Sequence, residues 1–184
     1  MTMWTHPTAI PDVCVVEPQV FGDARGHFME VWQAQRFARA GLDIDFVQDN
    51  RSRSAGGILR GLHYQLERPQ GKLVGVVAGE VFDVAVDMRR SSPTFGRWVG
   101  VTLSEHNHFM LWVPPGFAHG FYVTSDSADF FYKCSDYYAP EDEHTVVWND
   151  PDLGIDWPLI AGEHPRISDK DADGAAFQNA LCFP

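Results

Sequence analysis

Polar side chains of several kinds interrupt apolar segments in the first half of the chain. Gln48 and Asn50 belong to "FVQDN", Arg60 and His63 to "ILRGLHYQ", and Lys72 follows in "QGK". An imidazole titrates near neutrality and can exchange a proton, while arginine and lysine can hold an anion or stabilise a developing negative charge. Because neighbouring strands place such residues side by side, we expect the five to converge. The alternative is a surface strand with ordinary polar residues.

The segment Ile58 to Gln65 is the most informative of these stretches. Strict alternation along a strand divides its side chains between two faces, with Arg60, Leu62 and Tyr64 on one and Leu59, Gly61, His63 and Gln65 on the other. Neither face is purely apolar. The strand therefore lies either at the edge of a sheet or in the wall of a cavity, and we favour the cavity wall.

A second stretch, "WVPPGFAHGF", resembles the second sequence motif of cupins through Pro114, Gly116 and His119. In metal-dependent cupins that histidine is a ligand, and the first motif supplies two more histidines and a glutamate. Here the first motif reads His63, Tyr64, Gln65, which leaves too few nitrogen and carboxylate donors. We predict no metal, with a metal-dependent cupin that uses both histidines as the alternative.

The elements that must position these residues are predominantly strands. Short runs rich in Val, Phe, Trp and Tyr recur between turn residues, which is typical of antiparallel β-structure. In "VVAGEVFDVAVDM" the residues after Gly79 alternate, which predicts one wall of a sandwich. The one clear helix spans Gln33 to Gly41. We predict a single all-β domain over 1–184, a jelly-roll (cupin-like) β-sandwich or barrel with one or two short helices and a C-terminal wrapping segment after "DPDLGIDWP".

Composition narrows the classes of partner and the cell compartment. A net charge of -11 argues against nucleic acid and anionic membrane surfaces as partners, although a local basic pocket can still bind a small anion. No apolar run is long enough for a membrane span, and the N-terminus does not resemble a signal peptide. The three cysteines, Cys14, Cys134 and Cys182, fit a reducing compartment. These features predict a cytoplasmic protein.

Nine segments, in order and spacing, resemble the dTDP-4-dehydrorhamnose 3,5-epimerase family: "FGDARGHFMEVW", "FVQDNRSRS", "LRGLHYQ", "QGKLV", "GEVFDVAVDMRRSSPTFGRWVGVTLS", "WVPPGFAHGF", "FFYKCSDYYAPEDE", "WNDPDLGIDWP" and "ISDKD". The resemblance implies a homodimeric jelly roll that needs no cofactor. It also implies a substrate, dTDP-4-keto-6-deoxy-D-glucose, whose C4 ketone acidifies the hydrogens on C3 and C5.

The same resemblance assigns roles to matching residues. It implies that His63 is the general base, Asp171 its carboxylate partner, Tyr132 the acid on the opposite ring face, and Lys72 the cation near the C4 oxygen. It implies that the nucleotide is bound by Arg25, Arg60 and Lys170 at the diphosphate, by Tyr138 stacked on thymine, and by Glu30, Gln48, Asn50, His119 and Glu143. The segment with Arg25 and Glu30 is expected to cross to the partner subunit.

Other interpretations stay open from the sequence. An epimerase that inverts only C3 or only C5 shares the base and its carboxylate, and a carbohydrate-binding jelly roll without catalysis shares the fold. The sequence is also compatible with Tyr132 and Tyr138 as aromatic residues of the core whose hydroxyl groups reach water. His119 could instead stabilise the turn of its own segment, "PPGFAHG". Asp171 lies in "SDKDADG", which is also compatible with a solvent-exposed tail.

Overall fold

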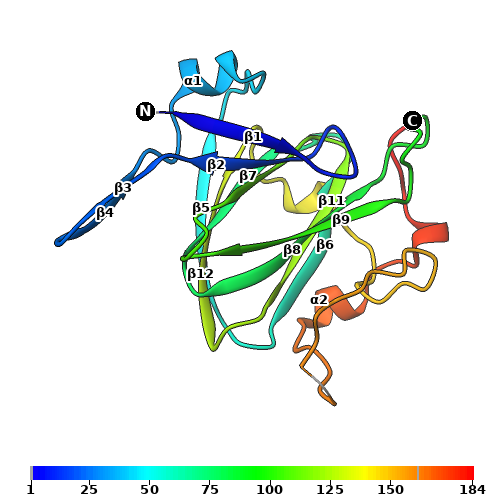
Figure 1. Cartoon of the computed structure of the whole chain (residues 1–184). Helices are drawn as coiled ribbons and strands as arrows, with labels where there is room; N and C mark the ends of the chain where they lie inside the picture. Colours follow the sequence, from blue (N-terminus) through cyan, green and yellow to red (C-terminus); the bar gives the residue numbers. More distant parts are fainter. Residues whose placement is uncertain (1, 161) are drawn as a thin grey trace.

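Two antiparallel sheets face each other in the computed structural model, which describes residues 2–160 and 162–184 (Figure 1). The first sheet has the strand order β1 (Met3–Pro7), β2 (Cys14–Pro18), β10 (Met110–Val113), β7 (Lys72–Ala78), β12 (Ser127–Cys134), β5 (Gln48–Ala55). The second has the order β13 (Glu143–Thr145), β6 (Leu59–Gln65), β11 (Phe117–Val123), β8 (Glu80–Asp87), β9 (Trp98–Ser104). This arrangement confirms the predicted all-β, cupin-like jelly roll.

Helices are few and short, as predicted. They are α1 (Ala34–Arg39), α2 (Asp169–Ala172) and the 3-10 turns η1 (Pro140–Asp142) and η2 (Phe177–Asn179). The side chain of Gln33 caps α1 by accepting a hydrogen bond from the N–H of Arg36, and Gly41 follows the helix at φ +89. No helix in the described part of the chain is long and apolar enough to cross a membrane.

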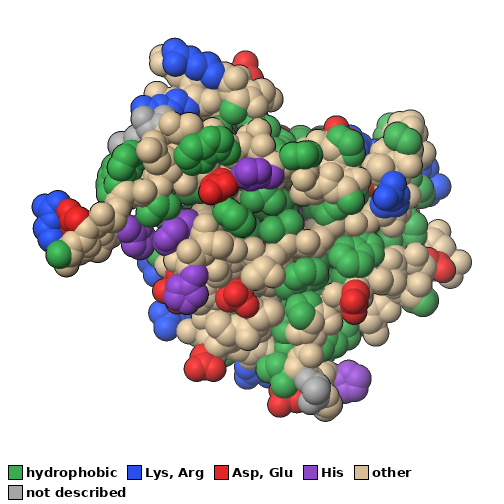
Figure 2. Space-filling view, in the orientation of Figure 1, with side chains coloured by type: hydrophobic (Ala, Val, Ile, Leu, Met, Phe, Trp, Pro, Cys, Tyr) green, Lys and Arg blue, Asp and Glu red, His purple; other side chains and the backbone are tan. Residues whose placement is uncertain are grey.

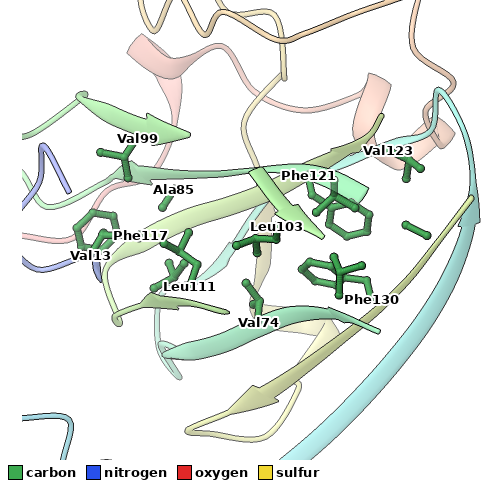
Figure 3. Close-up of a cluster of buried hydrophobic side chains, with 14 of the residues drawn as sticks. Val13, Val74, Ala85, Val99, Leu103, Leu111, Phe117, Phe121, Val123 and Phe130 are labelled. Atoms are coloured by element: carbon green, nitrogen blue, oxygen red, sulfur yellow. The ribbon is translucent and has the colours of Figure 1, made fainter. Parts of the chain in front are cut away.

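A core of apolar side chains fills part of the space between the sheets (Figure 3). Strand β8 contributes to it as its alternation predicts, because Val81 and Ala85 belong to this cluster, whereas Val84 and Val86 belong to a second cluster on the other face. The second sheet therefore has two covered faces over part of its area, and the first sheet has its own outer cluster, which includes Phe37 of α1 and Leu73 of β7. The walls of any cavity between the sheets are held by packing on both sides.

The second cluster is formed with the C-terminal segment, which wraps across the outside of the second sheet (Figure 1). Leu153, Trp157 and Ala180 pack against Leu59 and Leu62 of β6. Three isolated parallel bridges fasten the segment along its length, Ile58 to Arg166, Val146 to Ala175 and Arg89 to Phe183. This course returns residues 168–171 to the strands of the predicted site.

Strand β6 departs from the strict alternation expected for it. His63 lies opposite His119 on β11, and Arg60 lies opposite Phe121, so three steps along β6 match two along β11. The extra residue is a β-bulge, which moves Arg60 and His63 onto one face. Leu59 and Leu62 pack on the other face. The prediction that Arg60 and His63 lie on opposite faces is therefore wrong.

Candidate active site

A cavity of about 490 Å³ lies between the two sheets and is lined by residues of both. It brings together all the predicted site residues except Arg25 and Glu30. Those that line it are Gln48, Asn50, Arg60, His63, Lys72, His119, Tyr132, Tyr138, Glu143, Lys170 and Asp171. Gln48 and Asn50 of β5 and Arg60 and His63 of β6 therefore belong to a cavity wall.

His63 and Asp171 form an imidazole–carboxylate pair in the cavity wall. His63 Nε2 lies 2.5 Å from Asp171 Oδ1, and the carboxylate is almost completely buried. Because a carboxylate accepts from an imidazole N–H, the pairing places the ring proton on Nε2 and leaves Nδ1 free to accept a proton. Nδ1 is 3.9 Å from Glu143 Oε1, the next nearest carboxylate oxygen. The ring is thus set up as a base.

The carboxylate of Asp171 is held in its charged form by its surroundings. Burial alone raises the pKa of Asp171, but hydrogen bonds from His63, Ser168 and the Gly61 backbone, with the charge of His63, outweigh it and place the pKa below its ordinary value. Ser168 is also the N-cap of α2, because its hydroxyl accepts from the N–H of Asp171. A helix turn and the β6 bulge together position this carboxylate.

Lys72 and Tyr132 stand on the wall opposite His63, because they belong to strands of the first sheet. On β12, Tyr132 pairs with Asn50 of β5, and Cys134 pairs with Lys72 of β7. Burial raises the pKa of the Tyr132 phenol, and Arg60 acts in the opposite direction. Burial lowers the pKa of the Lys72 amine. A phenol that keeps its proton therefore faces an imidazole that can accept one.

Glu143 organises the rim of the cavity. Its Oε2 accepts from the Tyr138 hydroxyl at 2.6 Å and forms an ion pair with Lys170. The hydrogen bond to Glu143 raises the pKa of Tyr138 to about 12. Gln48 joins the same edge, since its Oε1 accepts from the Tyr138 N–H and its Nε2 donates to Asn50. Tyr138 stays half exposed, which leaves its ring open to a planar ligand.

His119 and Arg60 are fixed by partners deeper in the fold. His119 Nε2 lies 3.0 Å from both carboxylate oxygens of Asp83, which is completely buried on β8. Arg60 Nε donates to Ser54 Oγ at 3.1 Å and leaves the rest of its guanidinium free. These contacts hold both side chains in orientations in which they line the cavity.

Arg25 and Glu30 lie outside this cavity. Arg25 stands at the tip of the hairpin formed by β3 (Val20–Asp23) and β4 (Gly26–Met29), with its side chain 89% exposed and paired with Asp23. Glu30 pairs with Arg36 of α1. The hairpin projects from the body of the molecule in Figure 1, and its blue tip is visible in Figure 2. Within one chain, these two residues are therefore apart from the others.

Several cavity residues were not predicted: Ser52, Gln70, Gly120, Phe121, Phe130, Cys134 and Ser168. Two of them carry a signal in the sequence. Ser168 precedes Asp171 by three positions, which is the spacing of a helix-capping pair. Cys134 is two residues after Tyr132, so alternation along β12 points both side chains to the same face. Asp83, also unpredicted, contacts His119 from behind.

Within residues 2–160 and 162–184, no cluster of three or more His, Cys, Asp or Glu side chains is placed to hold a metal ion. The Nε2 atoms of His63 and His119 each face a carboxylate instead. The donor arrangement is that of hydrogen-bonded acid–base pairs.

A cupin-like jelly roll with an imidazole–carboxylate base across from a phenol defines the class of acid–base isomerases. The family model for dTDP-4-dehydrorhamnose 3,5-epimerase matches residues 7–179. An epimerase of that name from Pseudomonas aeruginosa is 58% identical over 177 residues, covering 96% of this chain and 97% of that protein. The chain belongs to the dTDP-4-dehydrorhamnose 3,5-epimerase family and is an epimerase.

Solved structures agree with this assignment. A dTDP-6-deoxy-D-glucose-3,5-epimerase from Legionella pneumophila, in complex with dTDP-4-keto-L-rhamnose, superposes with a TM-score of 0.93 at 54% identity, covering 97% of this chain and 94% of that one. A 3'-monoepimerase from Streptomyces bikiniensis, in complex with dTDP-quinovose, has a TM-score of 0.88 at 36% identity, with coverages of 94% and 87%. Sugar-nucleotide epimerases of differing regiochemistry therefore share this fold.

Proposed function

We propose that this epimerase inverts C3 and C5 of dTDP-4-keto-6-deoxy-D-glucose to give dTDP-4-keto-L-rhamnose, the step of dTDP-L-rhamnose biosynthesis that its family name describes. The observation that carries the proposal is the placement of His63 with Asp171 on one wall of the cavity and of Tyr132 with Lys72 on the other. A sugar ring bound between these walls presents one face to a base and the other to an acid.

Proton removal is the task of His63. A C–H bond next to a ketone ionises only when the enolate oxygen meets a positive donor, and one such donor is typically worth about 3 to 4 kcal/mol. Two amines line the cavity, and Lys72 is the one that can take this place, since Lys170 is paired with Glu143 at the rim. As Nδ1 of His63 accepts the proton, the buried Asp171 carboxylate stabilises the imidazolium.

Inversion requires a proton to return from the opposite face. Tyr132 is the residue placed to donate it, since burial keeps its phenol protonated and Arg60 stabilises the phenolate left behind. The same base and acid serve C3 and C5 if the bound sugar presents each carbon in turn. No cofactor takes part in these steps as proposed.

The nucleotide lies along the rim in this proposal. Arg60 and Lys170 bind the diphosphate, because a guanidinium presents paired donors to phosphate oxygens. Tyr138 stacks on the thymine, and the remaining polar residues of the predicted set contact the sugar or base: Gln48, Asn50, His119 and Glu143. Glu143 fixes Tyr138 and Lys170 relative to each other.

The working unit is proposed to be a homodimer in the cytoplasm, built from one domain per chain. The exposed hairpin that carries Arg25, together with Glu30 next to it, is too far from the cavity of its own chain to line it, which supports donation to a partner. The free thiols of all three cysteines fit a reducing compartment. The C-terminal segment supplies both a core cluster and Asp171, which supports a single domain.

Incubation with the keto sugar in D₂O tests the function. We expect deuterium at both C3 and C5 and formation of the L-rhamno product, in the presence of chelator as well as in its absence. Label at C3 alone would establish instead a monoepimerase, the activity of the Streptomyces bikiniensis protein that shares this fold at 36% identity. A carbohydrate-binding protein without catalysis would leave both positions unlabelled.

A further inference from the structure

The side chain of Gln65 stands at the end of β6, two residues after His63, yet it does not line the cavity. It occupies the position at which metal-dependent cupins carry the second histidine of their first motif. Gln65 is 3% exposed. An amide has two N–H donors and an oxygen acceptor, and its burial lowers stability unless these groups are hydrogen-bonded. Its partners therefore indicate what this residue does.

Backbone groups satisfy both the nitrogen and the oxygen of this amide. Nε2 donates to the carbonyl oxygens of Arg68 at 2.7 Å and of Tyr137 at 3.2 Å, and Oε1 accepts from the N–H of Ala139 at 3.0 Å. These partners also fix which way round the amide lies, because the reverse orientation would set its oxygen against two carbonyl oxygens. A histidine, a carboxylate or an apolar side chain could not make the same three contacts.

Two of these contacts flank Tyr138, the residue proposed to stack on thymine. Residues 137–139 lie between β12 and η1, outside any helix or strand. Tyr137 and Tyr138 are 55% and 50% exposed, so their own packing does little to fix the segment. Gln65 binds the carbonyl of the peptide group before Tyr138 and the N–H of the peptide group after it, and Gln48 accepts the N–H of Tyr138 itself at 2.9 Å. The backbone that carries the ring is therefore held on both sides.

The loop between β6 and β7 depends on Gln65 less than this segment does. Gln65 reaches that loop only at the carbonyl of Arg68, whereas three successive backbone N–H groups of the loop donate to the carboxylate of Asp142. The loop therefore keeps its main attachment when the amide is removed. We expect loss of the amide to act chiefly on residues 137–139.

We propose that Gln65 is a positioning residue for nucleotide binding, whose amide orders residues 137–139 so that the ring of Tyr138 is in place to stack on a pyrimidine base. The inference rests on the role given to Tyr138 in the proposed function. A ring that is ordered before the nucleotide arrives loses less conformational freedom on binding, which raises affinity. The proposal also explains the departure from the cupin motif, because an amide here ties the rim of the cavity where metal-dependent cupins have a ligand.

Gln65→Met tests the inference, because it keeps the length of the side chain and removes the amide. We expect isothermal titration to give a Kd for dTDP about tenfold higher than that of wild type, since two hydrogen bonds to the segment are lost. We expect KM to rise in parallel and kcat to stay within about threefold, because His63 and Tyr132 are untouched. An unchanged Kd in the folded variant would overturn the proposal, as would a fall in kcat without a change in Kd.

Asn107→Leu is the matched control. The Asn107 amide also makes three hydrogen bonds to backbone groups, those of Thr102, Ser104 and Phe109, but it lies between β9 and β10 and does not line the cavity. We expect this variant to melt at a lower temperature, as Gln65→Met does, yet to keep the Kd for dTDP within about twofold of wild type. Equal losses of dTDP affinity in the two variants would report general destabilisation and contradict the proposal.

A double-mutant cycle shows whether Gln65 acts through Tyr138. Tyr138→Ala should weaken dTDP binding by itself, and Gln65→Met should weaken it little further in that background. The same loss from Gln65→Met with and without the Tyr138 ring would mean that the amide acts elsewhere.

Gln65→Glu is the second variant if Gln65→Met does not fold, because it keeps the shape and the acceptor and loses both donors. It carries the same prediction for Kd. Failure of both to fold while Asn107→Leu folds would assign Gln65 a structural role only and overturn the proposal. A wild type that binds dTDP but shows no deuterium exchange would remove the proposed reaction and leave this inference, whereas normal exchange with an unchanged Kd in Gln65→Met would remove only this inference.

Discussion

At the residue scale, the proposed mechanism assigns proton acceptance and proton donation to residues of different sheets. His63 belongs to β6 of the second sheet and Tyr132 to β12 of the first. Each residue has its own means of control, a buried carboxylate for the imidazole and burial itself for the phenol. The two functions can therefore be removed one at a time.

Removal of the base should abolish exchange at both carbons. For His63→Ala we expect the rate of deuterium incorporation at C3 and C5 to fall by about 10² to 10⁴, since a positioned base contributes that much. Isothermal titration with dTDP should show binding close to wild type. Exchange that persists at either carbon would mean that His63 is not the only base.

Removal of the phenol should separate exchange from inversion. In Tyr132→Phe the base is intact, so we expect deuterium to enter from the His63 side while conversion to the L-rhamno product falls by about 10² or more. Mass spectrometry of recovered substrate measures the first quantity, and NMR of the product measures the second. Normal epimerisation by this variant would show that another acid serves the opposite face.

At the element scale, the β6 bulge brings Arg60 and His63, the residues proposed to act on the diphosphate and the sugar, to the same cavity. Gly61 has a φ of +124, and a Cβ there would meet Gly120 Cα at 2.5 Å and the carbonyl oxygen of His119 at 2.8 Å. The close approach of β6 to β11 therefore requires glycine at this point. The same residue donates its backbone N–H to Asp171.

Replacement of this glycine tests the bulge. Gly61→Ala should lower the melting temperature by several degrees and reduce epimerisation more strongly than stability, because the strand that carries His63 must move away from β11. Gly22→Ala is a suitable control for melting, since an added Cβ there meets only the carbonyl of Gly26 at 3.8 Å at an ordinary φ. Equal melting temperatures for the two variants would show that β6 tolerates the added methyl group.

A single carboxylate supports the loop between β6 and β7. Asp142 accepts backbone N–H groups from Leu66, Glu67 and Arg68. Burial raises its pKa, but these hydrogen bonds outweigh burial and hold the pKa below the ordinary 3.8. The stabilisation is therefore complete above pH 3.8 and is lost as the pH falls through the lowered pKa.

Asp142→Asn should therefore destabilise the protein in a pH-dependent way. We expect the free energy of unfolding to fall by about 1 to 3 kcal/mol at pH 7, and the difference from wild type to shrink as the pH falls below 3.8. Urea titrations at neutral and acidic pH measure both values. The exposed Asp152→Asn should change stability by less than about 0.5 kcal/mol at either pH.

The sequence predicted the strands and the short helix, because these depend on local alternation and on residue type. The alternation of β8 is an example, since it assigns Val81 and Val84 to opposite faces correctly. Among the residues that line the cavity, Tyr132, Tyr138 and Asp171 were predicted only through the resemblance to the family. The bulge in β6 could not be seen, because it arises from register between strands distant in sequence. Asp171 was ambiguous for the same reason, since only the path of the C-terminal segment brings it to His63.

At the scale of the whole molecule, the exposed hairpin of β3 and β4 does not line the cavity of its own chain. Phe21 and Phe28 are both well exposed on it, and Arg25 stands at its tip. Exposed aromatic side chains next to a charged tip are typical of a surface that is buried in an assembly. The proposed homodimer gives this hairpin a partner and gives the cavity its missing arginine.

Mixed dimers test whether the hairpin of one subunit completes the cavity of the other. Arg25→Ala and His63→Ala should each be poorly active alone, the first through a raised KM and the second through a lowered kcat. When the two are unfolded and refolded together, random pairing leaves one complete site in each mixed dimer, so we expect about a quarter of wild-type activity. Activity that stays at the sum of the two separate variants would show that the hairpin serves its own chain.

The wrapping C-terminal segment also has a consequence for synthesis of the protein. The strands of both sheets are encoded before residue 146, whereas the carboxylate that charges the base comes at Asp171. A nascent chain on the ribosome can therefore form its sandwich before it holds a functional base. We expect the proposed catalytic pair to form only after Asp171 has been synthesised and the segment after residue 146 has packed onto the second sheet.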